Sequence, residues 1–125
     1  VWSWNAFIGW VCGNACVWKP SEKTPMVSIA CQNIVAEVLE KTGAPAGICG
    51  LINGGREVGE WMAADERVPL VSATGSTRMG RAVAGVVARR LGRSLLELGG
   101  NNAIIISEHA DLNTTIIGSL FGAVG

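Results

Sequence analysis

Residues 68–80, VPLVSATGSTRMG, run from an apolar stretch through a glycine turn into the start of a helix. Val68–Ala73 has the composition of a strand, whose start Pro69 pushes toward an edge or entry position. Gly75–Gly80 opens a helix in which apolar residues recur at helical spacing, namely Val83, Val86, Val87 and Leu91. The stretch therefore predicts a strand–turn–helix unit of an α/β sheet.

The same alternation extends in both directions along the chain. Further strands are expected at short apolar runs bounded by turn residues: Ala15–Lys19, Ile48–Ile52, Arg93–Leu98 and Ala103–Ser107. Helices are expected at Trp2–Cys12, from a Thr24-Pro25 cap to about Lys41, at Glu57–Ala64, and after Asp111 as the cap of the last one. This order predicts an α/β fold with a mainly parallel, five-stranded sheet and helices on both faces.

Composition excludes several classes of function. The 125 residues suffice for one domain with a core, and 10 basic residues balance 10 acidic ones. With no basic stripe, neither nucleic acid nor an anionic membrane is expected as a partner. No signal peptide is visible, and no apolar stretch approaches the roughly 18 residues of a membrane span.

Four cysteines are present, and their spacing does not match a metal site. They form no CxxC pair, and the single histidine, His109, is far away in sequence. We therefore expect no metal and interpret them as reduced, mostly buried thiols of an intracellular protein: Cys12, Cys16, Cys31 and Cys49.

Gly75–Gly80 is a candidate anion site. Gly75 lets backbone N–H groups approach a ligand, Ser76 and Thr77 add hydroxyls, and the helix N-terminus favours a negative group such as a pyrophosphate. The alternative is an ordinary helix cap without a ligand. Neither the GxGxxG fingerprint nor the Gly-Lys-Ser/Thr ending of a P-loop is present.

Two further polar positions follow predicted strands. Lys19 and Glu22 could form hydrogen bonds with the hydroxyl groups of a ribose, or they could belong to a solvated turn. Glu97 lies between two leucines just ahead of two glycines. Burying a carboxylate there is unfavourable unless it is paired or protonated. It could act as a general base, or it could be a structural acid paired with an arginine such as Arg93.

Three motifs together resemble the aldehyde dehydrogenase superfamily. They are GNACVWKPSEKTP at 13–25, TGSTRMG at 74–80 and LLELGGNNAIII at 95–106, and they occur in that family's order over essentially the whole chain. Residues 93–106 further resemble the antiquitin-like branch, which oxidises α-aminoadipic semialdehyde or its cyclic form, piperideine-6-carboxylate.

The resemblance implies a Rossmann-like domain that binds NAD, and it assigns roles to single residues. Lys19 and Glu22 would hold the adenosine ribose, and Gly55 and Gly59 would border the adenine. The remaining roles are the pyrophosphate contact for Gly75 and Ser76, the nicotinamide contact for Leu98, the general base for Glu97, and the lining of the substrate passage for Trp4. Asn5 is too close to Gly13-Asn14 to be the family's oxyanion-stabilising asparagine, and Ala73 stands where the family usually has Phe.

The resemblance also implies what lies outside these residues. Residues 1–125 are expected to be part of the NAD-binding domain of a longer enzyme, inactive alone, without the catalytic-cysteine domain and the oligomerisation segment. The family oxidises a small aldehyde through a cysteine thioester, and its nucleophile follows the Glu-Leu-Gly-Gly motif, whereas all four cysteines here precede Glu97. A homotetramer in the cytoplasm, or in the mitochondrial matrix of a eukaryote, is expected for the full-length enzyme.

Two other functions stay open. A reductive relative with NADPH would act on an acyl phosphate or acyl-CoA, although Glu22 would repel the 2′-phosphate of that cofactor. A homologue without activity could bind nucleotide and perform no chemistry.

Overall fold

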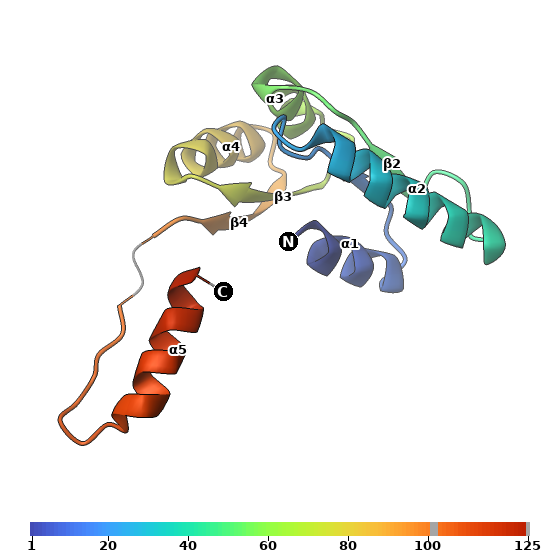
Figure 1. The fold of residues 1–125 in the computed structure, drawn as a ribbon. Coiled ribbons are helices and arrows are strands. Elements are labelled where there is room, and N and C mark those ends of the chain that lie inside the picture. Colours follow the sequence, from blue (N-terminus) through green and yellow to red (C-terminus); the bar gives the residue numbers. More distant parts are fainter. Residues whose placement is uncertain (101–102, 125) are drawn as a thin grey trace.

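The computed structural model describes residues 1–100 and 103–124. Helices and strands alternate along the chain (Figure 1). Their order is α1 (Trp2–Val11), β1 (Cys16–Trp18), α2 (Pro25–Lys41), β2 (Cys49–Leu51), α3 (Arg56–Ala64), β3 (Leu70–Gly75), α4 (Thr77–Arg89), β4 (Arg93–Leu98) and α5 (Leu112–Val124). The predicted α/β alternation is therefore confirmed, and none of the described helices is long and apolar enough to cross a membrane.

The first half of the chain is built on two short parallel strands. β1 pairs with β2 from Cys16 opposite Cys49 to Trp18 opposite Leu51. Helix α1 packs against β1, because Trp2 stacks on Trp18 with ring centroids 4.3 Å apart. Helix α2 packs against β2.

Three helix ends show how far the local sequence predicts these boundaries. Gly13 ends α1 in the left-handed region, with φ of 79°. Thr24 precedes α2 as predicted, but its side chain makes no capping hydrogen bond; Thr24 Oγ1 donates instead to the carbonyl oxygen of Ser21, at 3.5 Å. The capping prediction for Thr24 is therefore wrong, whereas the one for Asp111 is confirmed by a 2.7 Å bond from Thr114 N.

The second half places β3 and β4 side by side in parallel, with Leu70 opposite Arg93 and Gly75 opposite Leu98. Helix α4 covers one face of this pair and also contacts α3 (Figure 1). Since strand side chains alternate between faces, Val71, Ala73, Leu96 and Leu98 share the face toward α4. The other face carries Leu70, Ser72, Thr74, Leu95 and Glu97, which are all exposed. We call this second surface the open face.

The described residues do not form the single five-stranded sheet that the sequence predicts. They contain two separate two-stranded sheets, β1–β2 and β3–β4, and Ala103–Ser107 is not a strand. A strand exists only through hydrogen bonds to a neighbour, and 103–107 has none here. The prediction of helices on both faces is not met at β3–β4, where none of the described residues covers the open face.

Helix α5 lies apart from the other helices and strands (Figure 1). None of its residues is buried, and Ile116, Ile117, Leu120 and Phe121 are all more than half exposed. Its apolar surface therefore has no partner among the described residues.

Candidate functional site

The end of β1 and the start of α3 bring three of the predicted residues together. Lys19 Nζ donates a 2.8 Å hydrogen bond to the carbonyl oxygen of Pro20 and lies 3.9 Å from Glu22 Oε2. The Lys19 side chain is only 17% exposed, and it lies beside Gly59: a Cβ on that glycine would be 3.7 Å from Lys19 Cδ. The Glu22 side chain is 61% exposed, so its carboxylate is available to a ligand.

Gly55 belongs to the same region. It is the N-cap residue of α3, whose Gly59 faces Lys19. A Cβ at Gly55 would lie 2.8 Å from Glu57 Oε2, in the first turn of that helix. The predicted ribose and adenine residues therefore surround one helix start, beyond the carboxyl end of β1.

A second group lies where β3 passes into α4. Ser76 is the N-cap of α4, and its Oγ accepts a 3.2 Å hydrogen bond from Met79 N. The interpretation as a helix cap is thus confirmed, and a ligand role is compatible with it because the N–H groups of Thr77 and Arg78 have no acceptor within the helix. At Gly75 a Cβ would be 2.8 Å from Met79 Cε, so the backbone there is closely covered on one side.

The turn after β4 is tied to this helix start. Gly99 N donates to the carbonyl oxygen of Gly75 at 3.1 Å, and Thr77 Oγ1 donates to the carbonyl oxygen of Gly99 at 3.4 Å. The ends of β3 and β4 therefore form one connected edge. The sequence motifs indicated both glycine turns but not the bond between them.

Leu98 and Glu97 leave β4 in opposite directions. Leu98 lies on the α4 side, where its side chain occupies the space beside the missing Cβ of Gly80. Glu97 lies on the open face opposite Thr74 and is exposed. The expectation of a buried acid is wrong for this structure, because no part of the chain that the structure describes covers that face. An ion pair of Glu97 with Arg93 is not among those within residues 1–100 and 103–124.

Trp4 lies on the exposed side of α1, with 71% of its surface exposed. It takes no part in the aromatic cluster that joins α1 to β1, formed by Trp2, Phe7, Trp10 and Trp18. Its side chain is therefore free to line a passage, which is the role that the sequence predicted.

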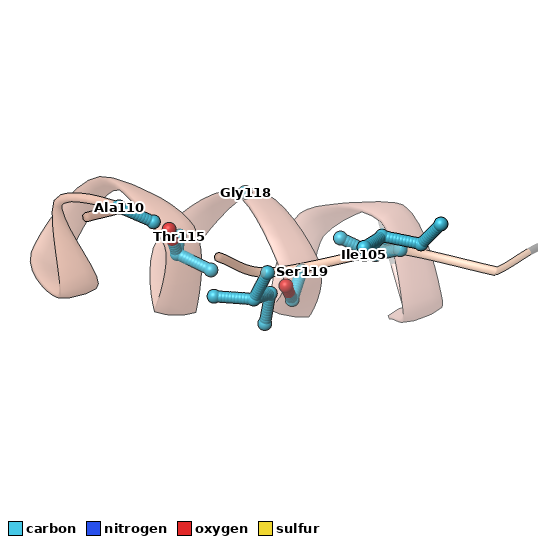
Figure 2. Close-up of a pocket in the computed structure, with 7 residues that line it drawn as sticks. Ile105, Ala110, Thr115, Gly118 and Ser119 are labelled. Atoms are coloured by element: carbon cyan, nitrogen blue, oxygen red, sulfur yellow. The ribbon is translucent and has the colours of Figure 1, made fainter. Parts of the chain in front are cut away.

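The hollow beside α5 and the cysteines offer no further candidate cofactor or metal site. A hollow of about 210 Å³ lies between residues 104–106 and α5 (Figure 2), and its lining holds no ionisable side chain. Within the described part of the chain, no group of three or more metal-binding side chains is present, and the four cysteines are free. The predicted cofactor residues are therefore kept as the candidate site, because they combine an ion pair with a capped helix start.

The whole chain, residues 1–125, matches the model of the aldehyde dehydrogenase family. The chain belongs to the aldehyde dehydrogenase family. Over all 125 residues it is 53% identical to the α-aminoadipic semialdehyde dehydrogenase of Bos taurus and 50% identical to aldehyde dehydrogenase family 7 member B4 of Arabidopsis thaliana. It spans 23% and 25% of these two relatives, respectively.

Solved structures of the family have a similar fold. An NAD⁺ complex of a Mycobacterium tuberculosis aldehyde dehydrogenase matches 88% of this chain with a TM-score of 0.75 and 34% identity. An NAD⁺ complex of Staphylococcus aureus betaine aldehyde dehydrogenase matches 86% with a TM-score of 0.73 and 37% identity. The chain covers 22% and 21% of those two structures.

Proposed function

We propose that these residues are the NAD-binding part of an aldehyde dehydrogenase that oxidises a semialdehyde, α-aminoadipic semialdehyde in the first instance, to the carboxylic acid. The observation that carries the proposal is the meeting of Lys19, Glu22 and Gly59 beyond β1, with Ser76 capping α4 beyond β3. In a parallel sheet, the carboxyl ends of the strands are where nucleotides bind. The substrate class comes from the similarity to the α-aminoadipic semialdehyde dehydrogenases.

The residues beyond β1 and those at the start of α4 each fit one part of a dinucleotide. Lys19 donates one ammonium N–H to the carbonyl oxygen of Pro20, and its two other N–H groups can donate to ribose hydroxyl oxygens. The exposed Glu22 carboxylate can accept hydrogen bonds from the same hydroxyl groups. Lys19 Cδ lies 3.7 Å from the place of a Cβ on Gly59, so the lysine stem and this turn of α3 border the same position. The start of α4 offers free N–H groups and a positive helix end to a pyrophosphate.

NAD⁺ supplies the hydride acceptor in this chemistry. Glu97 would act as the base that takes a proton from the nucleophilic thiol or from the water that releases the acid. In this proposal the nucleophile comes from a segment beyond Gly125, and the 125 residues alone do not turn over substrate. Leu98, held against Gly80, would border the reacting ring from the other side of β4.

Glu22 supports NAD over NADP. Its carboxylate lies 3.9 Å from the Lys19 ammonium group, so a 2′-phosphate bound at Lys19 would also meet a negative charge. The same charge disfavours a reductive, NADPH-dependent role. Homotetrameric assembly and a location in the cytoplasm or mitochondrial matrix stay predictions from the family resemblance.

The experiment is to incubate the full-length protein with α-aminoadipic semialdehyde and either NAD⁺ or NADP⁺, and to measure reduced cofactor and acid product. We expect one molecule of acid for each molecule of reduced cofactor, and a higher rate with NAD⁺ than with NADP⁺. Cofactor binding without any product from a set of semialdehydes would favour a homologue that only binds nucleotide. Activity only in the reverse direction, with NADPH and an acyl phosphate or acyl-CoA, would favour the reductive relative.

A further inference from the structure

Two cysteines stand side by side at the starts of neighbouring strands. Cys16 opens β1, Cys49 opens β2, and the two are Cα partners in the parallel ladder. Neighbouring strands lie about 4.8 Å apart, and residues at matched positions project from the same face. A disulfide requires Cα atoms roughly 4.4–6.8 Å apart, so this spacing needs no movement of the strands.

The surroundings of the pair hold Cys49 in place. Cys49 Sγ donates to Gln32 Oε1 at 3.3 Å, while Gln32 Nε2 donates to the carbonyl oxygen of Cys49 at 3.2 Å. Burial raises the pKa of both thiols, and the neighbouring Cys49 raises the pKa of Cys16 further. Both thiols therefore carry their protons near neutral pH, and exchange at this position proceeds through a minor thiolate fraction and becomes faster as the pH rises.

A cavity gives access to this position. It has a volume of about 330 Å³ and lies between the end of α2 and the start of β2, with Gln32, Leu39, Pro45 and Cys49 in its lining. This is the amino end of the strands, whereas Lys19 and Glu22 follow their carboxyl ends. The thiol pair is therefore separate from the candidate cofactor site.

We propose that Cys16 and Cys49 form a dithiol site that closes reversibly to a disulfide by exchange with a small disulfide of the glutathione class. Cys49 Sγ, reached through the cavity, loses its proton to solvent and attacks one sulfur of the small disulfide, whose S–S bond breaks to release one thiolate. Cys16 Sγ then loses its proton and attacks the Cys49 sulfur, which releases the second thiolate. The two protein thiols lose two electrons, and these reduce the small disulfide to two thiols.

The product would link the two strands of the first sheet covalently. A Cys16–Cys49 bond would join the α1–β1 segment to the α2–β2 segment and close the loop that contains α2. Closing a loop of this kind restricts the unfolded chain and stabilises the folded one. The oxidised protein should therefore unfold at a higher denaturant concentration than the reduced protein.

Peptide mapping of the full-length protein can identify the bond. Trypsin cleaves after Lys23, Lys41 and Arg56 but not between Lys19 and Pro20, so Cys31 falls on peptide 24–41 and Cys49 on peptide 42–56. Cys12 shares a peptide with Cys16, so the experiment uses a Cys12→Ser background. The protein is incubated with glutathione disulfide, its remaining thiols are blocked, and it is digested without reductant. The expected product joins peptide 42–56 to the peptide ending at Lys23 and disappears after treatment with dithiothreitol.

Variants and a second probe complete the test. Cys16→Ser should abolish the cross-linked peptide, whereas Cys31→Ser should leave its yield unchanged. An aryl arsenoxide, R–As=O, bridges only thiols that stand close together, and its oxygen leaves with the two thiol protons as one water. On the Cys12→Ser protein it should therefore join the same two peptides through arsenic. Glutathione attached to Cys49 without a cross-link, a cross-link to Cys31, or an arsenical found on neither peptide would overturn the proposal.

Discussion

The side chain of Leu98 fills the space that a Cβ on Gly80 would take, at the point where β4 passes beneath α4. An added Cβ would lie 2.5 Å from Leu98 Cδ1, 3.0 Å from its Cγ and closer still to its Cδ2. Gly80 is buried, and Leu98 is the residue that the resemblance assigns to the nicotinamide. The helix start that would hold the pyrophosphate and the strand end that carries Glu97 are thus in direct contact.

Gly80→Ala should therefore loosen this contact. Leu98 must move as a whole, and overpacking of this kind costs about 1–3 kcal/mol. Hydrogen exchange at the amides of α4 in the full-length protein measures the loss. Gly85→Ala is the matched control, since its Cβ would meet only Arg89 Nη1 at 3.9 Å, and it should stabilise the helix by up to about 1 kcal/mol. Equal effects of the two changes would contradict the account.

Ser76→Ala should weaken both the start of α4 and cofactor binding. The lost bond to Met79 N is worth about 1 kcal/mol as a helix cap. Thr24→Ala provides the comparison, because Thr24 precedes α2 without a capping bond and its removal should cost much less. Thermal unfolding and NAD⁺ titration of both variants would measure the two effects. A Thr24→Ala variant that loses as much stability as Ser76→Ala would argue against the assigned cap.

Arg90 joins α3 to the segment before β3. Its Nε donates to the carbonyl oxygen of Ala63 at 2.8 Å, and its Nη2 donates to that of Val68 at 2.7 Å. Arg90→Met leaves two carbonyl groups without their donor and should cost about 2 kcal/mol. Arg89→Met, a change at the exposed neighbouring residue, should cost well under about 1 kcal/mol. The measurement is hydrogen exchange across α3 and β3, and unchanged protection in Arg90→Met would show that the bonds contribute little.

Glu22→Gln should narrow the preference for NAD⁺ over NADP⁺. The substitution removes the charge that repels a 2′-phosphate and weakens the hydrogen bonds to the ribose. The quantity to compare is the ratio of kcat/KM for the two cofactors in the full-length enzyme. Glu66→Gln, at an exposed acid after α3, should leave that ratio unchanged. An unmutated enzyme that uses both cofactors equally well would remove the basis for this prediction.

Local patterns predicted the strand–helix units because apolar spacing and turn residues act within a few positions of the chain. β3 and α4 lie where residues 68–80 indicated, and Ser76 is the cap between them. Strand pairing depends on residues that are far apart in the sequence. Residues 103–107 have the composition of a strand, but they pair with no strand among the described residues. The sequence therefore could not establish the single sheet.

The candidate site, too, could be predicted only in part from the sequence. Lys19 and Glu22 were found from their position after a strand, and the structure brings them to Gly59. The exposure of Glu97 depends on what covers the open face, which its leucine neighbours do not encode. Cys16 and Cys49 each lie near the start of a predicted strand, but only the register of β1 and β2 shows that they are opposite each other.

The central claim is tested most directly by turnover of full-length Glu97→Gln with NAD⁺ and α-aminoadipic semialdehyde. Glu97 is exposed and has no ion pair among the described residues, so the change should leave the melting temperature and NAD⁺ affinity intact. If Glu97 is the general base, kcat should fall by roughly 10²–10⁴, and a higher pH should recover part of it. Near-normal turnover in the folded, NAD-binding variant would contradict the account and leave Glu97 without a catalytic role.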